Sequence, residues 1–182
     1  CALCFALTAC GPSDEDQAKE ALDAQLGQLV NPSDDTISKL SDEAKMGAGS
    51  SFSTLNMDST AFVKSWLSGF SYEIGDVKVD GDTAKAETAV TCKQLYVIMT
   101  SWGDSFESDA LSQQFTSIDE VYTYAGKTFM DAIDGAQPVT TNVTFTLEKD
   151  GGDWTFASNS DNDQALADAL LGGGADASFF QN

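Results

Sequence analysis

The chain has 182 residues, of which 42% are hydrophobic, and its 29 acids face only 9 bases, giving a formal net charge of −20. That length and apolar content fit one globular domain with a buried core. All nine bases are lysine, and the chain has no arginine and no histidine. This excludes nucleic-acid binding, and it removes imidazole bases, Ser–His nucleophile pairs and histidine metal ligands.

The first thirteen residues have the layout of a lipid-attachment signal. Residues 1–9 are uncharged and largely apolar, Leu7-Thr8-Ala9 stand directly before Cys10, and a polar acidic stretch follows. This pattern resembles a bacterial lipobox. The resemblance implies that residues 1–9 end a lipoprotein signal peptide whose charged leader lies upstream, and that residues 10–13 are a lipidated tether. Palmitate-like chains on Cys10 would hold the protein on the extracytoplasmic face of the cell membrane. An ordinary secretory signal or a buried N-terminal strand are the alternatives.

Three helices are expected before residue 70. Ser13 is a good N-cap for an amphipathic helix over residues 14–30, which Asn31-Pro32 ends. Ser33 begins a second helix that ends at Gly47, and residues 47–53 form a loop. The third helix begins at Asp58 and carries bulky side chains expected in the core: Phe62, Trp66, Leu67 and Phe70.

The hydrophobic period then changes to two. Residues 72–80 and 84–92 alternate as strands do, and Asp80-Gly81 between them predicts a tight hairpin turn. Residues 94–103 predict a short helix that ends near Gly103. Residues 109–133 give the clearest helix, expected to lie across the sheet, with a coiled-coil seam as the weaker alternative. Its apolar stripe consists of Leu111, Phe115, Ile118, Tyr122, Ala125, Phe129 and Ile133.

A second hairpin and a last helix complete the chain. Residues 139–147 alternate as a strand, residues 149–153 turn, and Trp154 and Phe156 return as the partner strand. Asp161 or Asn162 is expected to cap a final helix that ends at the glycines from residue 172 onward.

These elements predict an α+β fold: N-terminal helices and a four-stranded antiparallel sheet from two β-hairpins, with the long helix between them packed on one face. Residues 14–172 form this single domain, and residues 173–182 are a C-terminal tail with Phe179-Phe180.

The last third of the domain carries a family resemblance. The hairpin from Thr141 to Trp154, the acidic Asp161-Asn162-Asp163 and the ending Ala169-Leu170-Leu171-Gly172 resemble domains of unknown function in lipoproteins of Gram-positive bacteria. The hairpin over residues 72–84 fits as well, so the resemblance covers about 70–170. It implies a cone-shaped fold of the cystatin or nuclear-transport-factor type, and it brings no catalytic residues.

No residue is assigned a catalytic, cofactor-binding or metal-binding role. Once Cys1, Cys4 and Cys10 are removed or lipidated, Cys92 is a lone thiol on a strand, expected to be a small buried hydrophobe with Lys93 on the other face. The spacing of Asn159, Asp161 and Asp163 is that of a calcium loop. The pattern fails further on, because Gln164 replaces the expected glycine and Leu170 the closing acid.

The function expected from the sequence is non-catalytic. The chain would be a lipid-anchored, monomeric cell-envelope protein that binds an unidentified protein or wall polymer through its sheet or cone mouth, without a cofactor. The first alternative is a small-ligand binder associated with transport, which a pocket lined by Trp66, Trp102 or Tyr122 would favour. The second is a hydrolase that uses two facing carboxylates.

Overall fold

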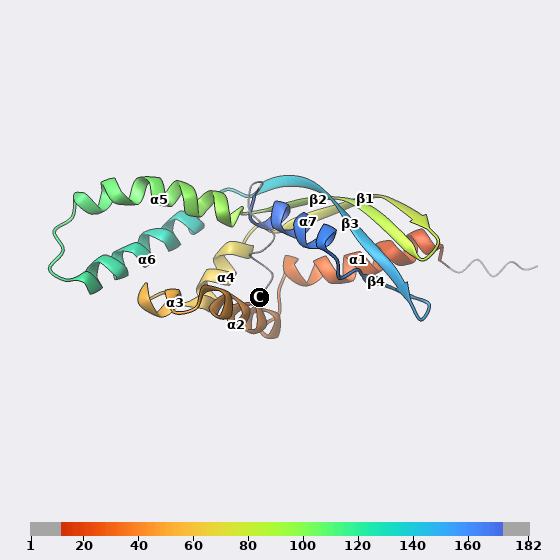
Figure 1. Cartoon of the computed structure of the whole chain (residues 1–182), viewed down its shortest axis with the longest axis horizontal. Coiled ribbons are helices and arrows are strands. Elements are labelled where there is room, and N and C mark those ends of the chain that lie inside the picture. The colour runs from red at the N-terminus through yellow and green to blue at the C-terminus, as the bar shows by residue number, and fades with distance from the viewer. Residues whose placement is uncertain (1–11, 173–182) are drawn as a thin grey trace, which may run out of the picture.

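A curved antiparallel sheet of four strands forms one half of the computed structural model, which describes residues 12–172 (Figure 1). The strands lie side by side in chain order, which confirms the predicted α+β fold with its sheet built from two hairpins. Their bounds are β1 Ser71–Asp80, β2 Thr83–Cys92, β3 Val139–Asp150 and β4 Asp153–Phe156. The sheet is open, because β1 and the short β4 are its two edges.

Glycine makes the tight turns of both hairpins. Asp80 pairs with Thr83, and Gly81 between them has a φ of 62°, a left-handed conformation that suits a two-residue turn. Gly151 and Gly152 join β3 to β4 with φ values of 61° and 107°. The predicted turns are therefore confirmed.

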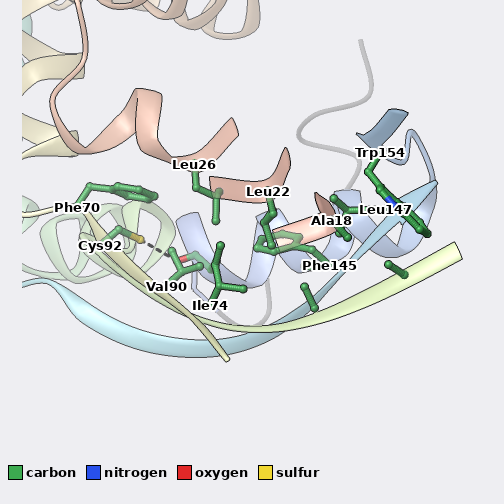
Figure 2. Close-up of a cluster of buried hydrophobic side chains, with 14 residues drawn as sticks. Ala18, Leu22, Leu26, Phe70, Ile74, Val90, Cys92, Phe145, Leu147 and Trp154 are labelled. Carbon is green, nitrogen blue, oxygen red and sulfur yellow. Dashed lines mark hydrogen bonds between the residues drawn. The ribbon is translucent and has the colours of Figure 1, made fainter. Parts of the chain in front are cut away.

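Two helices cover one face of the sheet. Helix α1, Asp14–Val30, lies against both edge strands, and α7, Ser160–Leu170, lies against β3 and β2. Ser13 caps α1 as expected, because its Oγ accepts from the Asp16 N–H at 3.1 Å while the Asp16 carboxylate accepts from the Ser13 N–H. Figure 2 shows how the core fills the space between α1 and the sheet, with Ala18, Leu22 and Leu26 pointing toward Ile74, Val90, Phe145 and Leu147.

A second hydrophobic cluster joins the remaining helices. Helices α2 (Asp34–Ala48), α3 (Ser51–Thr54) and α4 (Ser59–Leu67) precede the sheet, and Asp58 caps α4 as expected. Helix α2 ends one residue beyond Gly47, and α3 occupies part of the expected loop. The cluster has at its centre Ile37, Phe62, Val63, Leu67, Ile98 and Ile133.

The helix predicted over residues 109–133 is wrong. Instead, α5 runs over Leu95–Leu111, well past Gly103, and α6 over Ile118–Gly135, with a turn between them. Ser117 caps α6 by accepting from the Glu120 N–H, and the Glu120 carboxylate accepts from the Thr116 N–H at 2.7 Å. These bonds satisfy free donors at a helix start, so they begin a new helix where the apolar stripe runs on unbroken.

The long helix was also expected to cover the sheet, and it does not. Helix α6 packs against α5, α4 and α3, while α1 and α7 take the place on the sheet. Gly126 explains part of this packing, because a side-chain carbon there would overlap the carbonyl oxygen of Leu55. The absence of a side chain thus lets the segment after α3 press against α6.

The cap of α7 differs from expectation as well. Asn159, not Asp161 or Asn162, is the N-cap, and it accepts from the Asn162 N–H at 2.9 Å. The buried Asn162 side chain instead bonds the backbone of β3 and of the residue that follows β4. Its Oδ1 accepts from the Thr146 N–H at 2.8 Å, and its Nδ2 donates to the carbonyls of Thr146 and Ala157 at 2.8 and 2.7 Å. It therefore continues the hydrogen bonding of the sheet where β4 has ended.

Helices α5 and α6 form an antiparallel hairpin that projects from the body (Figure 1). The hairpin is inserted between two adjacent strands, because Cys92 at the end of β2 pairs with Val139 at the start of β3. Along the long axis of the molecule, its tip lies at the end opposite the start of α1 (Figure 1).

Candidate binding surface

The predicted lipidation residue, Cys10, lies outside the described residues, as do residues 1–9, the first part of the tether and the tail 173–182. Within residues 12–172, the surface features that could serve binding gather on the α5–α6 hairpin.

A groove of about 620 Å³ runs along one side of the hairpin. Its two walls are helical stripes with spacings of three and four, so each wall is one face of a helix. The wall from α5 consists of Gln94, Val97, Ile98, Ser101, Trp102, Ser105, Phe106 and Asp109. The wall from α6 and the start of β3 consists of Thr128, Asp131, Ala132, Gly135, Ala136, Gln137 and Val139.

Aromatic contacts hold the two helices of the hairpin together. The Trp102 ring lies 5.1 Å from that of Phe129, and its Nε1–H donates to Thr128 Oγ1 at 3.0 Å. Nearer the tip, Tyr124 contacts Phe106 and Phe115, with ring centroids 6.1 and 5.4 Å apart. Such ring pairs add stability beyond the area they bury, so the groove has a preformed floor.

The base of the hairpin is fixed to the body by a buried lysine. Lys93 is only 4% exposed, and its Nζ donates to the Ile133 carbonyl at 2.8 Å, near the C-terminus of α6. Trp66 Nε1–H donates to the carbonyl of Lys93 at 2.9 Å. A cation beside the last carbonyls of a helix is favourable, although burial lowers the pKa of Lys93. The hairpin is thus held firmly where it leaves the sheet.

Apolar side chains are unusually exposed on this hairpin. Of the nine large hydrophobic side chains exposed in the described part of the chain, seven lie between residues 96 and 139. Ile98 is the one buried residue among the 17 of α5, although that helix is as apolar as the buried α4. The seven are Tyr96, Val97, Met99, Leu111, Ile118, Tyr122 and Val139, of which the first six lie on α5 and α6 and Val139 begins β3. Such a concentration makes the hairpin the candidate interaction surface of the described residues.

The hairpin is also strongly acidic. Residues 95–135 hold seven acids and one lysine, Lys127. That lysine lies 2.6 Å from Asp131, whose carboxylate raises the pKa of Lys127 through their hydrogen bond. Glu120 accepts from both the N–H and the hydroxyl of Thr116, which lowers the pKa of its carboxyl group. With seven acids and one lysine, the hairpin carries a net negative charge.

Only one of the three aromatics whose presence in a pocket would favour a small-ligand binder lines the groove. Trp102 lines the groove, Trp66 supports the hairpin base, and Tyr122 lies on α6 outside the groove. Asp109 and Asp131 both line the groove, but Lys127 pairs with Asp131. The groove thus brings together one of the predicted aromatics and two carboxylates.

Cys92 is a buried hydrophobe, as predicted. It is 1% exposed, burial raises the pKa of its thiol to about 11, and Sγ donates to the Ala169 carbonyl at 2.9 Å, drawn as a dashed line in Figure 2. A thiol of this kind is largely protonated at neutral pH and inert.

The calcium-like spacing near residue 160 is explained by the helix start. Asn159 caps α7, and Asp161 and Asp163 lie in its first turn, where carboxylates favour the helix N-terminus. Within residues 12–172 no group of three or more acids or cysteines is arranged to hold a metal ion.

No helix in the described part of the chain combines the length and the apolar character needed to cross a membrane.

Comparison with known proteins gives one similar structure. No protein-family model matches the chain, and no curated protein matches it. A solved structure from Bacillus subtilis subsp. subtilis str. 168, the candidate lipoprotein ycdA, is similar with a TM-score of 0.54 and 15% sequence identity. The match covers 86% of this chain and 56% of that one, so this chain spans little more than half of the solved protein. The two chains share a fold over that length.

Proposed function

We propose that this chain is a non-catalytic, lipid-anchored protein of the cell envelope that binds another macromolecule through the α5–α6 hairpin. One observation carries the binding part: the preformed hairpin bears six of the nine exposed large apolar side chains in the described residues, and a seventh, Val139, lies at its base at the start of β3. Leaving this apolar surface in water is unfavourable, and covering it with a partner recovers about 25 cal/mol for each Å². An exposed apolar surface of this type is typical of an interaction site.

The anchoring part rests on the sequence around Cys10. Leu7-Thr8-Ala9-Cys10 fits a lipobox, and the acidic stretch after it suits a tether. The similar structure from Bacillus subtilis is described as a candidate lipoprotein, which agrees with this reading. Two or more acyl chains are needed for stable attachment, since one chain alone holds weakly.

The geometry of the body supports an outward-facing hairpin. The tether would join the chain at the start of α1, where Asp14 bonds Lys149 at 2.5 Å and Trp154 at 3.3 Å beside the β3–β4 turn. The α5–α6 tip lies at the other end of the long axis (Figure 1). A protein attached through Cys10 would therefore carry its binding surface away from the bilayer, and its acidic body would be repelled by anionic headgroups.

Two features favour binding over catalysis. The groove lies open to solvent along the hairpin, whereas catalytic electrostatics gain strength where water is excluded. The lone thiol of the described residues, Cys92, is buried and protonated. In the groove lining, the Ser105 hydroxyl donates to the backbone carbonyl of Trp102 at 3.0 Å.

Two measurements on the native protein test this proposal. Mass spectrometry of the membrane fraction should find acyl chains on Cys10, and Cys10→Ser should release the protein to the soluble fraction. A photo-crosslinking amino acid at Tyr96 or Leu111 on the hairpin should give a defined cross-linked product in intact cells, while one at Glu73 on β1 should not. A free thiol at Cys10, or equal cross-linking from both surfaces, would contradict the proposal.

A small-ligand binder associated with transport is the second candidate. It is favoured by the volume of the groove, about 620 Å³, which lies in the range of small-molecule sites, and by Trp102 in its lining. A thermal-shift screen of envelope metabolites would support this candidate if one of them raised Tm in the wild type and not in Trp102→Leu.

A further inference from the structure

We infer that the α5–α6 groove receives a basic amphipathic helix from a partner protein. This inference rests on the proposed function and names the chemistry of the partner. It is argued from the shape of the groove, its apolar contacts and the sign of its charge.

The shape of the groove fits a third helix. From Val97 to Asp109 the α5 wall extends for about 18 Å, at 1.5 Å per residue, which is the length of a helix of about 12 residues. Small side chains alternate along both walls, with Ser101 and Ser105 on one and Ala132 and Gly135 on the other. They allow a partner backbone to approach to the 8–10 Å typical of packed helices.

The apolar contacts lie at the spacing that one face of a helix would present. Val97 is 47% exposed at the edge of the groove, and Ile98, Trp102 and Phe106 line it at intervals of four residues. Binding of an amphipathic helix in an apolar groove uses this arrangement, with anchors at i, i+3, i+4 and i+7. A large apolar residue of the partner would therefore be placed against Trp102.

The charge of the groove indicates that the partner helix is basic. The lining holds two carboxylates, Asp109 and Asp131, and no lysine. The hairpin as a whole has seven acids, and Lys127 is paired with Asp131. A second copy of the chain would bring another −20 and another acidic hairpin, and like charges facing each other cost several kcal/mol. A helix with lysines or arginines flanking an apolar stripe complements the groove.

The direct test is a titration of the full chain with a defined peptide. The probe is an amphipathic peptide of about 14 residues, made of leucine on one face and lysine on the other, a length that fills the groove. The same peptide with glutamate replacing lysine is the comparison. The lysine peptide should bind at least about tenfold more tightly, and raising salt from about 50 to about 300 mM should weaken it.

Matched variants localise the binding. Val97→Ser should weaken binding of the lysine peptide about tenfold, and Met46→Ser, which removes a still more exposed apolar side chain on α2, should leave it unchanged. Asp109→Asn should weaken it about threefold, and Asp76→Asn, which removes the same charge from an exposed position on β1, should not. Circular dichroism and Tm of each variant check that it is folded.

Other outcomes overturn the inference in distinguishable ways. Equal binding of both peptides, or equal effects of the paired variants, would refute a basic partner. A concentration-dependent dimer that Val97→Ser abolishes would identify a second copy as the occupant. If a chain ending at Gly172, which contacts Val97, binds the peptide and the full chain does not, residues 173–182 occupy the groove. In each case hairpin cross-linking in cells separately decides the proposed function.

Discussion

Replacing Asn162 by alanine should destabilise the protein far more than its size implies. The side chain is 1% exposed and makes three hydrogen bonds to backbone groups of Thr146 and Ala157. In the variant the Thr146 carbonyl keeps the Ala157 N–H at 3.1 Å, but the Thr146 N–H and the Ala157 carbonyl lose their partners. Each buried backbone group left unpaired costs about 1–3 kcal/mol, so the free energy of unfolding should fall by about 2–6 kcal/mol.

Urea unfolding followed by far-ultraviolet circular dichroism measures this change. With a slope of about 2 kcal/mol per molar urea, the midpoint should move down by about 1–3 M. Asn142→Ala is the matched control, because this asparagine lies on the same strand but is exposed. Its effect should stay within about 0.5 kcal/mol.

Hydrogen exchange locates the effect. The Thr146 amide should lose its protection in Asn162→Ala, while amides in the middle of β2 keep theirs as long as the protein is folded. A loss of less than about 1 kcal/mol, or an unchanged Thr146 amide, would refute the argument that this side chain replaces the missing length of β4.

Three further predictions concern packing and pH. Gly126→Ala should lower the free energy of unfolding, measured in urea, by about 1–3 kcal/mol, because the added methyl group meets a backbone carbonyl. Gly103→Ala, in the open middle of α5, is the control and should be neutral or stabilising. Equal effects of the two substitutions would contradict the close packing at Gly126. Burial raises the pKa of the Cys92 thiol to about 11 in the folded state, so the stability that the neutral thiol contributes is present below pH 9 and lost as pH rises toward 11. Cys92→Ala should therefore flatten the alkaline decline of Tm. An unchanged slope would show that burial of the thiol does not cause this decline. The hydrogen bond from Lys149 lowers the pKa of Asp14, so the stability that this pair contributes should be lost as pH falls below the ordinary value of 3.8. Asp14→Asn should therefore make Tm less sensitive to acid. An identical acid profile in the variant would refute the pairing.

The sheet and its hairpins could be predicted from the sequence because their signals are local. The alternation at period two and the turn glycines at 81, 151 and 152 are each recognised from a few consecutive residues. The capped starts of α1 and α4 have the same local origin. The pairing of β1 with β2 and of β3 with β4 then follows, since hairpin partners are neighbours. The pairing of β2 with β3 joins strands far apart in sequence and is seen only in the structure.

The hairpin of helices was missed because two signals compete there. The apolar stripe from Leu111 to Ile133 is continuous in sequence, but Ser117 and Glu120 form a helix start within it. The Ser-x-x-Glu pattern was visible and would have predicted the break. The exposure of α5 could not be predicted from the sequence, because an apolar helix is normally expected in the core.

The role of Asn162 lay beyond sequence reasoning for a different reason. A polar residue in the first turn of a helix is usually a cap, whereas here its partners are 16 and 5 residues away on the sheet side. Only the tertiary arrangement brings β3 close to Asn162.

The position of the groove also depends on the tertiary arrangement, because its walls come from two helices whose register is set by the turn between them.

The position of the hairpin within the sheet makes the protein modular. Cys92 and Val139 already pair as neighbours, so the register of β2 and β3 is set without help from the 46 residues inserted between them. Contacts with α3 and α4 involve α6 from Gly126 onward, toward its C-terminal end. Whole helical turns added to or removed from the distal part of α5 and α6 would change reach and specificity while the strands stay in place. If the hairpin binds a partner as proposed, its binding surface can therefore change while the sheet and the helices that cover it keep their fold.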